Sequence, residues 1–145
     1  MRALSVKQPW AQLIRDGRKS LEIRTWTTPY RGPLIIVASL QWARDDEDAI
    51  VWKDVDGDRG ALVCLVTLED VRHAAKDGSD DGAACCTLPR RGDPPFAWVL
   101  RDPVPLRPMK CRGSLGLYKL QPGVSIISLD GRAIDEAPSS QAPRL

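Results

Sequence analysis

The residues with the clearest capacity for chemistry lie in one short stretch, residues 17–26. Charged and aromatic side chains alternate there with apolar ones, and in a strand alternate side chains point to opposite faces. One face would suit a core and carries Leu21, Ile23 and Thr25. The other face would present a hydroxyl, an acid, a guanidinium and an indole, from Ser20, Glu22, Arg24 and Trp26. This pattern fits either a binding surface or a solvated outer face with a Glu–Arg pair.

Three charged side chains of this stretch are suited to specific tasks. Lys19 and Arg24 could bind phosphate, Arg24 through a bidentate contact of its guanidinium, with solvated surface charge as the alternative. Glu22 could neutralise Arg24, accept hydrogen bonds from a base edge such as the amino group of cytosine, or act as a general base. If the protein is an enzyme, Lys19 and Glu22 are therefore the candidate catalytic pair.

Three further side chains are candidates for the walls of such a site. Trp10 could stack on a base, a contact worth about 1–3 kcal/mol, although its helical spacing with the apolar residues that follow favours a core position. Trp26 shares a strand face with Arg24, so it is a stronger candidate than Trp10 for the wall of a cleft. Arg31 lies in a turn before an apolar strand, where it would contact phosphate or stand at the rim.

The sequence offers little for metal or cofactor chemistry. A single histidine, His73, argues against a two-histidine ribonuclease mechanism and a histidine-based metal site. Residues 54–58 resemble the start of a calcium loop, but Leu65 stands where the loop needs a bidentate glutamate. The cysteines have no CxxC spacing and are expected to be free thiols: Cys64, Cys85, Cys86 and Cys111. We therefore expect neither a metal nor a cofactor.

Length and composition fit one folded domain. The chain has 145 residues, of which 43% are hydrophobic and 28% charged, as in ordinary globular proteins. No apolar run approaches the roughly 20 residues of a membrane-spanning helix. The first residues are charged too early for a signal peptide. We expect a cytoplasmic protein that does not bind membranes.

The net charge of +2 hides a strong pattern along the chain. Residues 1–40 hold seven Lys/Arg against two Asp/Glu, and residues 86–120 hold the same numbers, so each block carries +5. Residues 41–85 hold five against twelve, which gives −7. If the two basic blocks meet in space, they would form a patch suited to a phosphate-bearing partner.

Periodicity and turn residues predict one early helix and six or seven short strands. The helix spans residues 8–17, with Pro9 suited to its first turn and Gly17 to its end. Single short helices are expected around residues 45–52 and within 72–88. The predicted strands cover residues 2–6, 20–26, 34–40, 61–69, 96–100, 104–110 and 114–120, with a further hairpin or strand at 124–127. Because the connections look too short for parallel crossovers, we expect an α+β fold built on a small, mostly antiparallel β-barrel with peripheral helices.

Several motifs, taken together, resemble the ASCH (activating signal cointegrator homology) domain, a branch of the PUA-like superfamily. The first three are Leu4-Ser5-Val6-Lys7-Gln8-Pro9-Trp10-Ala11, Gly17-x-Lys19-x-x-Glu22-x-Arg24-Thr25-Trp26, and Tyr30-Arg31-Gly32-Pro33-Leu34-Ile35-Ile36. Later pieces agree, at residues 60–71, 96–100 and 112–118. The resemblance covers residues 1–120. Residues 121–145 would form a C-terminal extension, whose end is rich in Ala, Pro and Ser and is expected to be flexible.

The resemblance implies a PUA-like barrel with a cleft beside the first helix and the strand after it. In the family this cleft is lined by residues that match Lys19, Glu22 and Arg24, with the positions of Gln8, Trp10 and Arg31 close by. It also implies a role related to RNA or other nucleic acids. Members are described as RNA- or DNA-binding coregulators, as ribonucleases, and as small amidohydrolases that deacetylate N4-acetylcytidine.

The amidohydrolase branch is matched only in part. Its working set is a lysine, a threonine three residues later and a distant glutamate. Lys19 matches the lysine, but Glu22 occupies the threonine position, and Thr25 is expected to face the core. Glu69 could stand for the distant acid. Hydrolysis would therefore need a different mechanism, with the Lys–Glu pair activating a water.

The sequence thus favours binding of RNA or a modified nucleotide in a basic cleft. Phosphate or ribose would be held by Lys19, Arg24 and Arg31, the base would be read by Glu22, and a tryptophan would wall the site. A hydrolase of a modified nucleoside or a ribonuclease using the same cleft is the alternative. A protein-interaction module with a vestigial cleft is the third.

Overall fold

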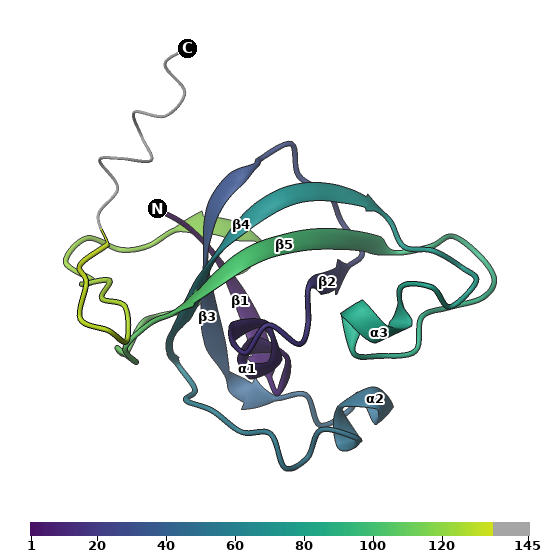
Figure 1. The fold of residues 1–145 in the computed structure, drawn as a ribbon, viewed down its shortest axis with the longest axis horizontal. Helices are drawn as coiled ribbons and strands as arrows, with labels where there is room; N and C mark the ends of the chain where they lie inside the picture. Colours follow the sequence, from purple (N-terminus) through teal and green to yellow (C-terminus); the bar gives the residue numbers. More distant parts are fainter. Residues whose placement is uncertain (135–145) are drawn as a thin grey trace.

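The computed structural model describes residues 1–134 as a six-stranded sheet with three short helices (Figure 1). In chain order the elements are β1 (Arg2–Gln8), α1 (Trp10–Arg15), β2 (Leu21–Arg24), β3 (Gly32–Trp42), α2 (Glu47–Ile50), β4 (Ala61–His73), α3 (Asp81–Ala84), β5 (Phe96–Pro105) and β6 (Leu117–Lys119). Within these residues, no helix is long and apolar enough to cross a bilayer.

The strand order is β2-β5-β4-β3-β1-β6, and β1 and β3 run parallel. The other neighbouring pairs are antiparallel. The expectation that the connections are too short for parallel pairing was therefore wrong for this pair. That expectation was based on the connections between strands adjacent in sequence. β1 and β3 are not adjacent in sequence: they are joined by residues 9–31, which include α1 and β2 and are long enough for a crossover.

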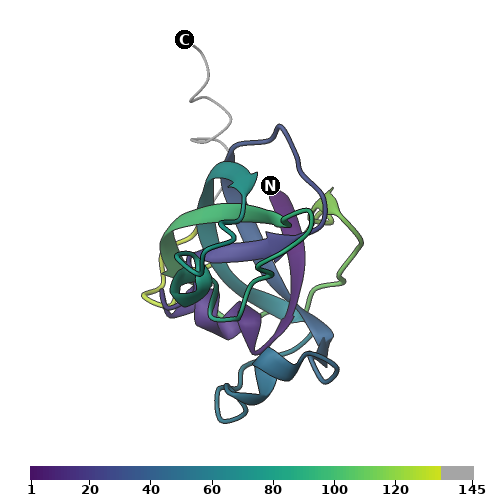
Figure 2. The same ribbon diagram turned by 90° about the vertical axis from the view of Figure 1, so that its right-hand side faces the viewer.

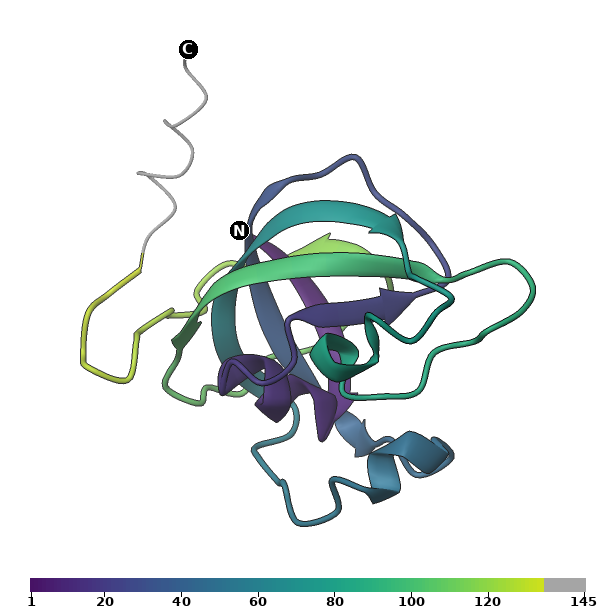
Figure 3. The ribbon, with the colours of Figure 1, turned by 45° about the vertical axis from the view of Figure 1, so that its right-hand side comes forward.

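The sheet, whose edge strands are β2 and β6, curls strongly, and β2 is brought round toward β1 (Figures 1 and 3). Within residues 1–134, no backbone pairing joins these two edges. One side chain spans the opening instead, because Nη2 of Arg24 on β2 donates to the carbonyl oxygen of Ser5 on β1 at 2.8 Å. The mostly β fold is as expected, but the closed barrel is not confirmed.

Two apolar clusters lie on opposite faces of the curled sheet. Leu4 of β1 and Ile36 of β3 belong to the first, and their neighbours Ala3 and Ile35 belong to the second. Burial on both faces explains the continuous apolar run in β3. The first cluster also contains the buried face of α1, formed by Trp10, Ala11, Leu13 and Ile14. α1 thereby covers one end of the curled sheet (Figure 3).

The predicted strands agree with the structure apart from their ends and two segments. β2 ends at Arg24, so Thr25 is exposed and does not face the core as expected. The strand expected at 104–110 is not separate, because β5 continues to Pro105 and only isolated bridges, at Leu106 and Lys110, follow within this range. The hairpin expected near 124–127 is reduced to isolated bridges, one between Ile127 and Ala133.

Part of the C-terminal extension packs on the sheet. Val124, Ile126 and Ile134 contact the second apolar cluster. Ser128 is buried and accepts a hydrogen bond from the backbone N–H of Arg132. The extension therefore covers an outer face of the sheet as far as residue 134. The end that we expected to be flexible lies outside the described residues.

The loop that carries α3 is anchored by Asp80. Nη1 and Nη2 of Arg72 on β4 donate to its carboxylate, at 2.8 and 2.9 Å, and the backbone N–H of Ala75 donates at 2.7 Å. These bonds, those from Arg72 above all, lower the pKa of Asp80 to about 2. The carboxylate thus ties the loop to the sheet throughout the neutral range.

We expect acid to release this tie. Because the pKa of Asp80 is lower in the folded chain than its usual 3.8, its contribution is complete above about pH 4 and is lost as the pH falls toward 2. Asp80→Asn should lower the free energy of unfolding at pH 7 by about 1–2 kcal/mol, a value reduced for the exposure of Arg72. Urea unfolding at several pH values measures this effect, with the exposed Asp93→Asn as control. Parallel acid profiles for Asp80→Asn and wild type would contradict it.

Candidate functional site

An open cleft of about 1030 Å³ lies where the curled sheet fails to close. Its walls come from β1, from β2, from the end of β3 and from the segment 110–116, with the start of α1 also contributing. Figure 2 shows β1 and β6 beside the end of β2 on this side of the molecule. The cleft thus brings together chain segments from both basic blocks.

The structure divides the predicted site residues into two groups. Trp10, Glu22 and Arg24 line the cleft. The remaining four do not line it: Gln8, Lys19, Trp26 and Arg31. This division places three of the seven candidates in one cavity.

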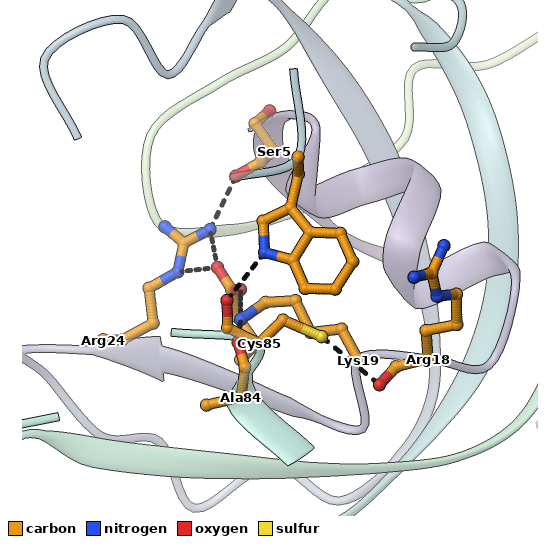
Figure 4. Close-up of polar contacts among 8 residues, drawn as sticks. Ser5, Arg18, Lys19, Arg24, Ala84 and Cys85 are labelled. Atoms are coloured by element: carbon orange, nitrogen blue, oxygen red, sulfur yellow. Dashed lines mark hydrogen bonds and ion pairs between the residues drawn. The ribbon is translucent and has the colours of Figure 1, made fainter. Parts of the chain in front are cut away.

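Glu22 and Arg24 form a fixed pair on the cleft wall. Figure 4 shows the side chain of Arg24 with its contact to Ser5. The alternation of β2 sends both side chains to the inner face, while Leu21 and Ile23 pack in a third apolar cluster. Nε of Arg24 donates to Glu22 Oε2 at 2.9 Å, and Nη2 reaches both the same oxygen and Ser5 O. A guanidinium held at three points presents its remaining N–H groups in a defined direction.

Lys19 lies behind this pair and is not a surface charge. Its side chain is 3% exposed, and Nζ donates to the carbonyl oxygen of Ala84 at 2.6 Å. Nζ also lies 3.7 Å from Glu22 Oε1 and 4.9 Å from the centre of the Trp10 ring. The ammonium group therefore supports Glu22 from within, and direct phosphate contact by Lys19 finds no support in this geometry.

A second layer of contacts holds Ala84 in place (Figure 4). The indole Nε1 of Trp52 donates to Cys85 O at 2.9 Å, and the thiol of Cys85 lies 3.4 Å from Arg18 O. The guanidinium of Arg18 in turn stacks over the Trp52 ring at 4.7 Å. The α3 loop and the segment after α2 are thus connected to the cleft through Lys19.

The other three predicted residues make contacts within the fold, outside the cleft. Gln8 is fully buried, and its amide joins α1 to the acidic segment through Gln12 N–H and Asp58 O. Trp26 packs edge-on against Trp98, with ring centres 4.8 Å apart. Arg31 is exposed and donates to the backbone carbonyls of the turn that precedes β3.

The cleft contains cations that reasoning from motifs missed. Lys7, Lys110 and Arg112 line it together with Arg24, so both basic blocks contribute. The charge pattern left open whether the two blocks meet, and it did not indicate which residues would do so. Lys7, Lys110 and Arg112 have no ion pair within residues 1–134, whereas Arg72, Arg90 and Arg101 elsewhere each face a carboxylate.

The cysteines near the cleft are not activated as thiolates, and the described residues form no cluster of metal ligands. Cys111 lines the cleft, and burial raises the pKa of its thiol. Burial also raises the pKa of Cys86 to about 11, so both groups stay protonated near neutral pH. Among residues 1–134, no group of three or more His, Cys, Asp or Glu side chains is arranged to hold a metal ion.

A curled, mostly antiparallel sheet with a helix over one end and an open basic cleft at its seam defines a PUA-like domain. Within that class, the chain belongs to the ASCH domain family, whose sequence model matches residues 4–98. The solved structure of the ASCH protein from Zymomonas mobilis has the same fold. It superposes with a TM-score of 0.59 over 83% of this chain and 87% of that chain, at 15% sequence identity.

Sequence similarity to two relatives supports the family assignment. Activating signal cointegrator 1 of Homo sapiens is 56% identical over an alignment of 114 residues, and the match covers 69% of this chain and 19% of the relative. The Mus musculus protein of the same name is 53% identical over 36 residues, or 25% of this chain and 6% of the relative. The chain thus spans about a fifth of the length of the human relative.

Proposed function

We propose that this domain binds RNA or a modified nucleotide in the cleft between β2 and the segment 110–116. The observation that carries the proposal is the convergence of Lys7, Arg24, Lys110 and Arg112 on one cavity. These cations come from two basic blocks separated by an acidic block of −7. The membership of the chain in the ASCH family supports the same role.

Electrostatics favours a phosphate-bearing ligand over a neutral one. Glu22 is the carboxylate among the lining residues, and Arg24 already neutralises it. The charges of Lys7, Lys110 and Arg112 therefore remain to attract an anion. Cations grouped in a concave surface raise the local concentration of anionic ligands and speed their association.

The cleft also offers surfaces for a base. Leu40 and Leu115 stand at its rim with 79% and 96% of their area exposed, and Trp10 forms part of its wall. Apolar and aromatic side chains beside cations are typical of single-strand binding sites, where bases stack and phosphates meet positive charge. An exocyclic amino group of the base would donate to the Glu22 carboxylate, which is the pairing that carboxylates favour at base edges.

We expect the double variant Lys110→Gln/Arg112→Gln to bind single-stranded RNA more weakly and with less salt dependence. If the two residues contact two phosphates, the slope of log K against log salt should fall by about 1.4. Fluorescence anisotropy with a labelled eight-nucleotide oligouridine at 50–200 mM salt measures this change.

The matched control is Lys76→Gln/Arg91→Gln, which removes the same charge from exposed residues that do not line the cleft. It should keep the wild-type slope. Equal slopes for all three proteins would contradict the cleft as the binding site, and no salt-dependent binding by the wild type would contradict nucleic-acid binding itself.

The hydrolase alternative has less support. Lys19 Nζ is already bonded to Ala84 O and does not line the cleft, which leaves Glu22 as the group able to act as a base. Incubation of the wild type and Glu22→Gln with N4-acetylcytidine, followed by chromatography, decides this point. Product that forms only with the wild type would make the domain an enzyme. A protein partner, a cytoplasmic location and a domain boundary at residue 120 remain our proposals from the sequence.

A further inference from the structure

β1 and β6 place two exposed cations directly opposite each other. Arg2 pairs in register with Lys119, so in this antiparallel pair both side chains leave the same face with Cβ atoms about 5 Å apart. Like charges at such positions destabilise a sheet. Neither side chain has an ion pair within residues 1–134. The pair is therefore an uncompensated concentration of positive charge.

Two neighbouring groups interact with this charge. The guanidinium of Arg2 lies over the Tyr30 ring, 5.9 Å from its centre. The pKa of the Met1 amino group is lowered by burial first, and then by the charges of Lys119 and Arg2. An anion bound between Arg2 and Lys119 would relieve the repulsion and would lie close to an aromatic ring.

Arg2 of this pair lies on β1, the strand that also forms part of the cleft wall. Ser5, which lines the cleft and accepts from Arg24, lies three residues along β1 from Arg2. At the rise of a strand, that separation is about 10 Å. It corresponds to roughly three nucleotides at 3.4 Å per nucleotide of a stacked strand. Figure 2 shows β6 beside β1 near the N-terminus.

We propose that Arg2 and Lys119 form a second phosphate-binding site, outside the cleft, for the same nucleic-acid strand. The inference rests on the proposed function, because it extends the strand from the cleft along β1 and β6. It also specifies the ligand. A strand long enough to reach both sites should bind better than a trinucleotide, whose phosphates are taken up by the cleft.

The test compares oligouridines of three and eight nucleotides on the wild type, on Arg2→Gln/Lys119→Gln and on the control Lys76→Gln/Arg91→Gln. With the eight-nucleotide probe, the wild type and the Arg2/Lys119 variant should both lose affinity as salt rises from 50 to 200 mM. The loss should be about sevenfold larger for the wild type, because the Arg2/Lys119 variant lacks two of its phosphate contacts. For the three-nucleotide probe, these two proteins should show the same salt dependence. The control should follow the wild type with both probes.

The outcomes separate this inference from the proposed function. Wild-type salt dependence in the Arg2/Lys119 variant with the longer probe would overturn the second site and leave the cleft intact. Absence of salt-dependent binding by the wild type would overturn both.

A ligand-free measurement adds an independent check. Lys119→Gln should raise the Tm in 20 mM salt, and this gain should vanish in 500 mM salt, where repulsion between exposed charges is screened. An unchanged or lower Tm at low salt would contradict the repulsion on which the inference is built.

Discussion

Replacing Glu22 with glutamine should lower the free energy of unfolding by about 3–5 kcal/mol. The Glu22 side chain is 8% exposed and carries the negative charge for Lys19 on one side and Arg24 on the other. Glutamine keeps the volume but removes the charge. Lys19, which is almost fully buried, would then hold its charge against only the Ala84 carbonyl and the Trp10 ring. An uncompensated buried ammonium is the main source of the loss.

Urea unfolding of three proteins tests this account. Lys19→Met added to Glu22→Gln should recover part of the lost stability, because it removes the stranded charge. Glu69→Gln is the control: it breaks an ion pair with Arg101 whose side chains are both about half exposed, and it should cost less than 1 kcal/mol. A Glu22→Gln effect as small as that of Glu69→Gln, or no recovery in the double variant, would contradict a buried pair.

Lys19 therefore acts on the cleft through Glu22. The chain Ala84–Lys19–Glu22–Arg24–Ser5 connects the α3 loop to β2 and then to β1. Each contact fixes the next, so Arg24 reaches the cleft in one orientation. Of the three charged residues in this motif, Lys19 is buried and holds Glu22 in place, whereas Glu22 and Arg24 line the cleft.

The local elements of this site follow from the sequence because they depend on neighbouring residues. Alternation correctly placed Glu22 and Arg24 on one face of β2 and Leu21 on the other. Helical spacing correctly predicted burial of Trp10 with the apolar face of α1, although its edge also lines the cleft. Neither property requires knowledge of distant segments.

The burial of Lys19 could not be predicted in this way. Its partner Ala84 lies 65 positions further along the chain, in a loop with weak periodicity. The same holds for Lys110 and Arg112, which reach the cleft only because the segment before β6 returns to β1. Parallel pairing of β1 with β3 is likewise a property of the whole chain path and left no local pattern.

Replacing Trp98 with alanine should be the most destabilising core substitution that we consider, at about 3–5 kcal/mol. Its side chain is completely buried in the first apolar cluster. It pairs in register with Glu22, so both lie on the inner face of the β2–β5 pair. Its indole N–H donates to Trp26 O at 3.2 Å, and its ring meets the edge of Trp26. Alanine would leave a cavity beneath the cleft wall and an unsatisfied carbonyl at the end of β2.

Two further variants separate the packing from the hydrogen bond. Trp98→Phe keeps most of the ring but not the donor, so it should cost only about 1–2 kcal/mol, as expected for a lost hydrogen bond with slightly looser packing. Trp26→Ala removes a partly exposed ring and should cost less than Trp98→Ala. Urea unfolding followed by far-ultraviolet circular dichroism avoids the change in tryptophan fluorescence. Equal losses for Trp98→Ala and Trp98→Phe would show that the N–H bond, and not the buried ring, holds β2 against β5 beside the Glu22–Arg24 pair.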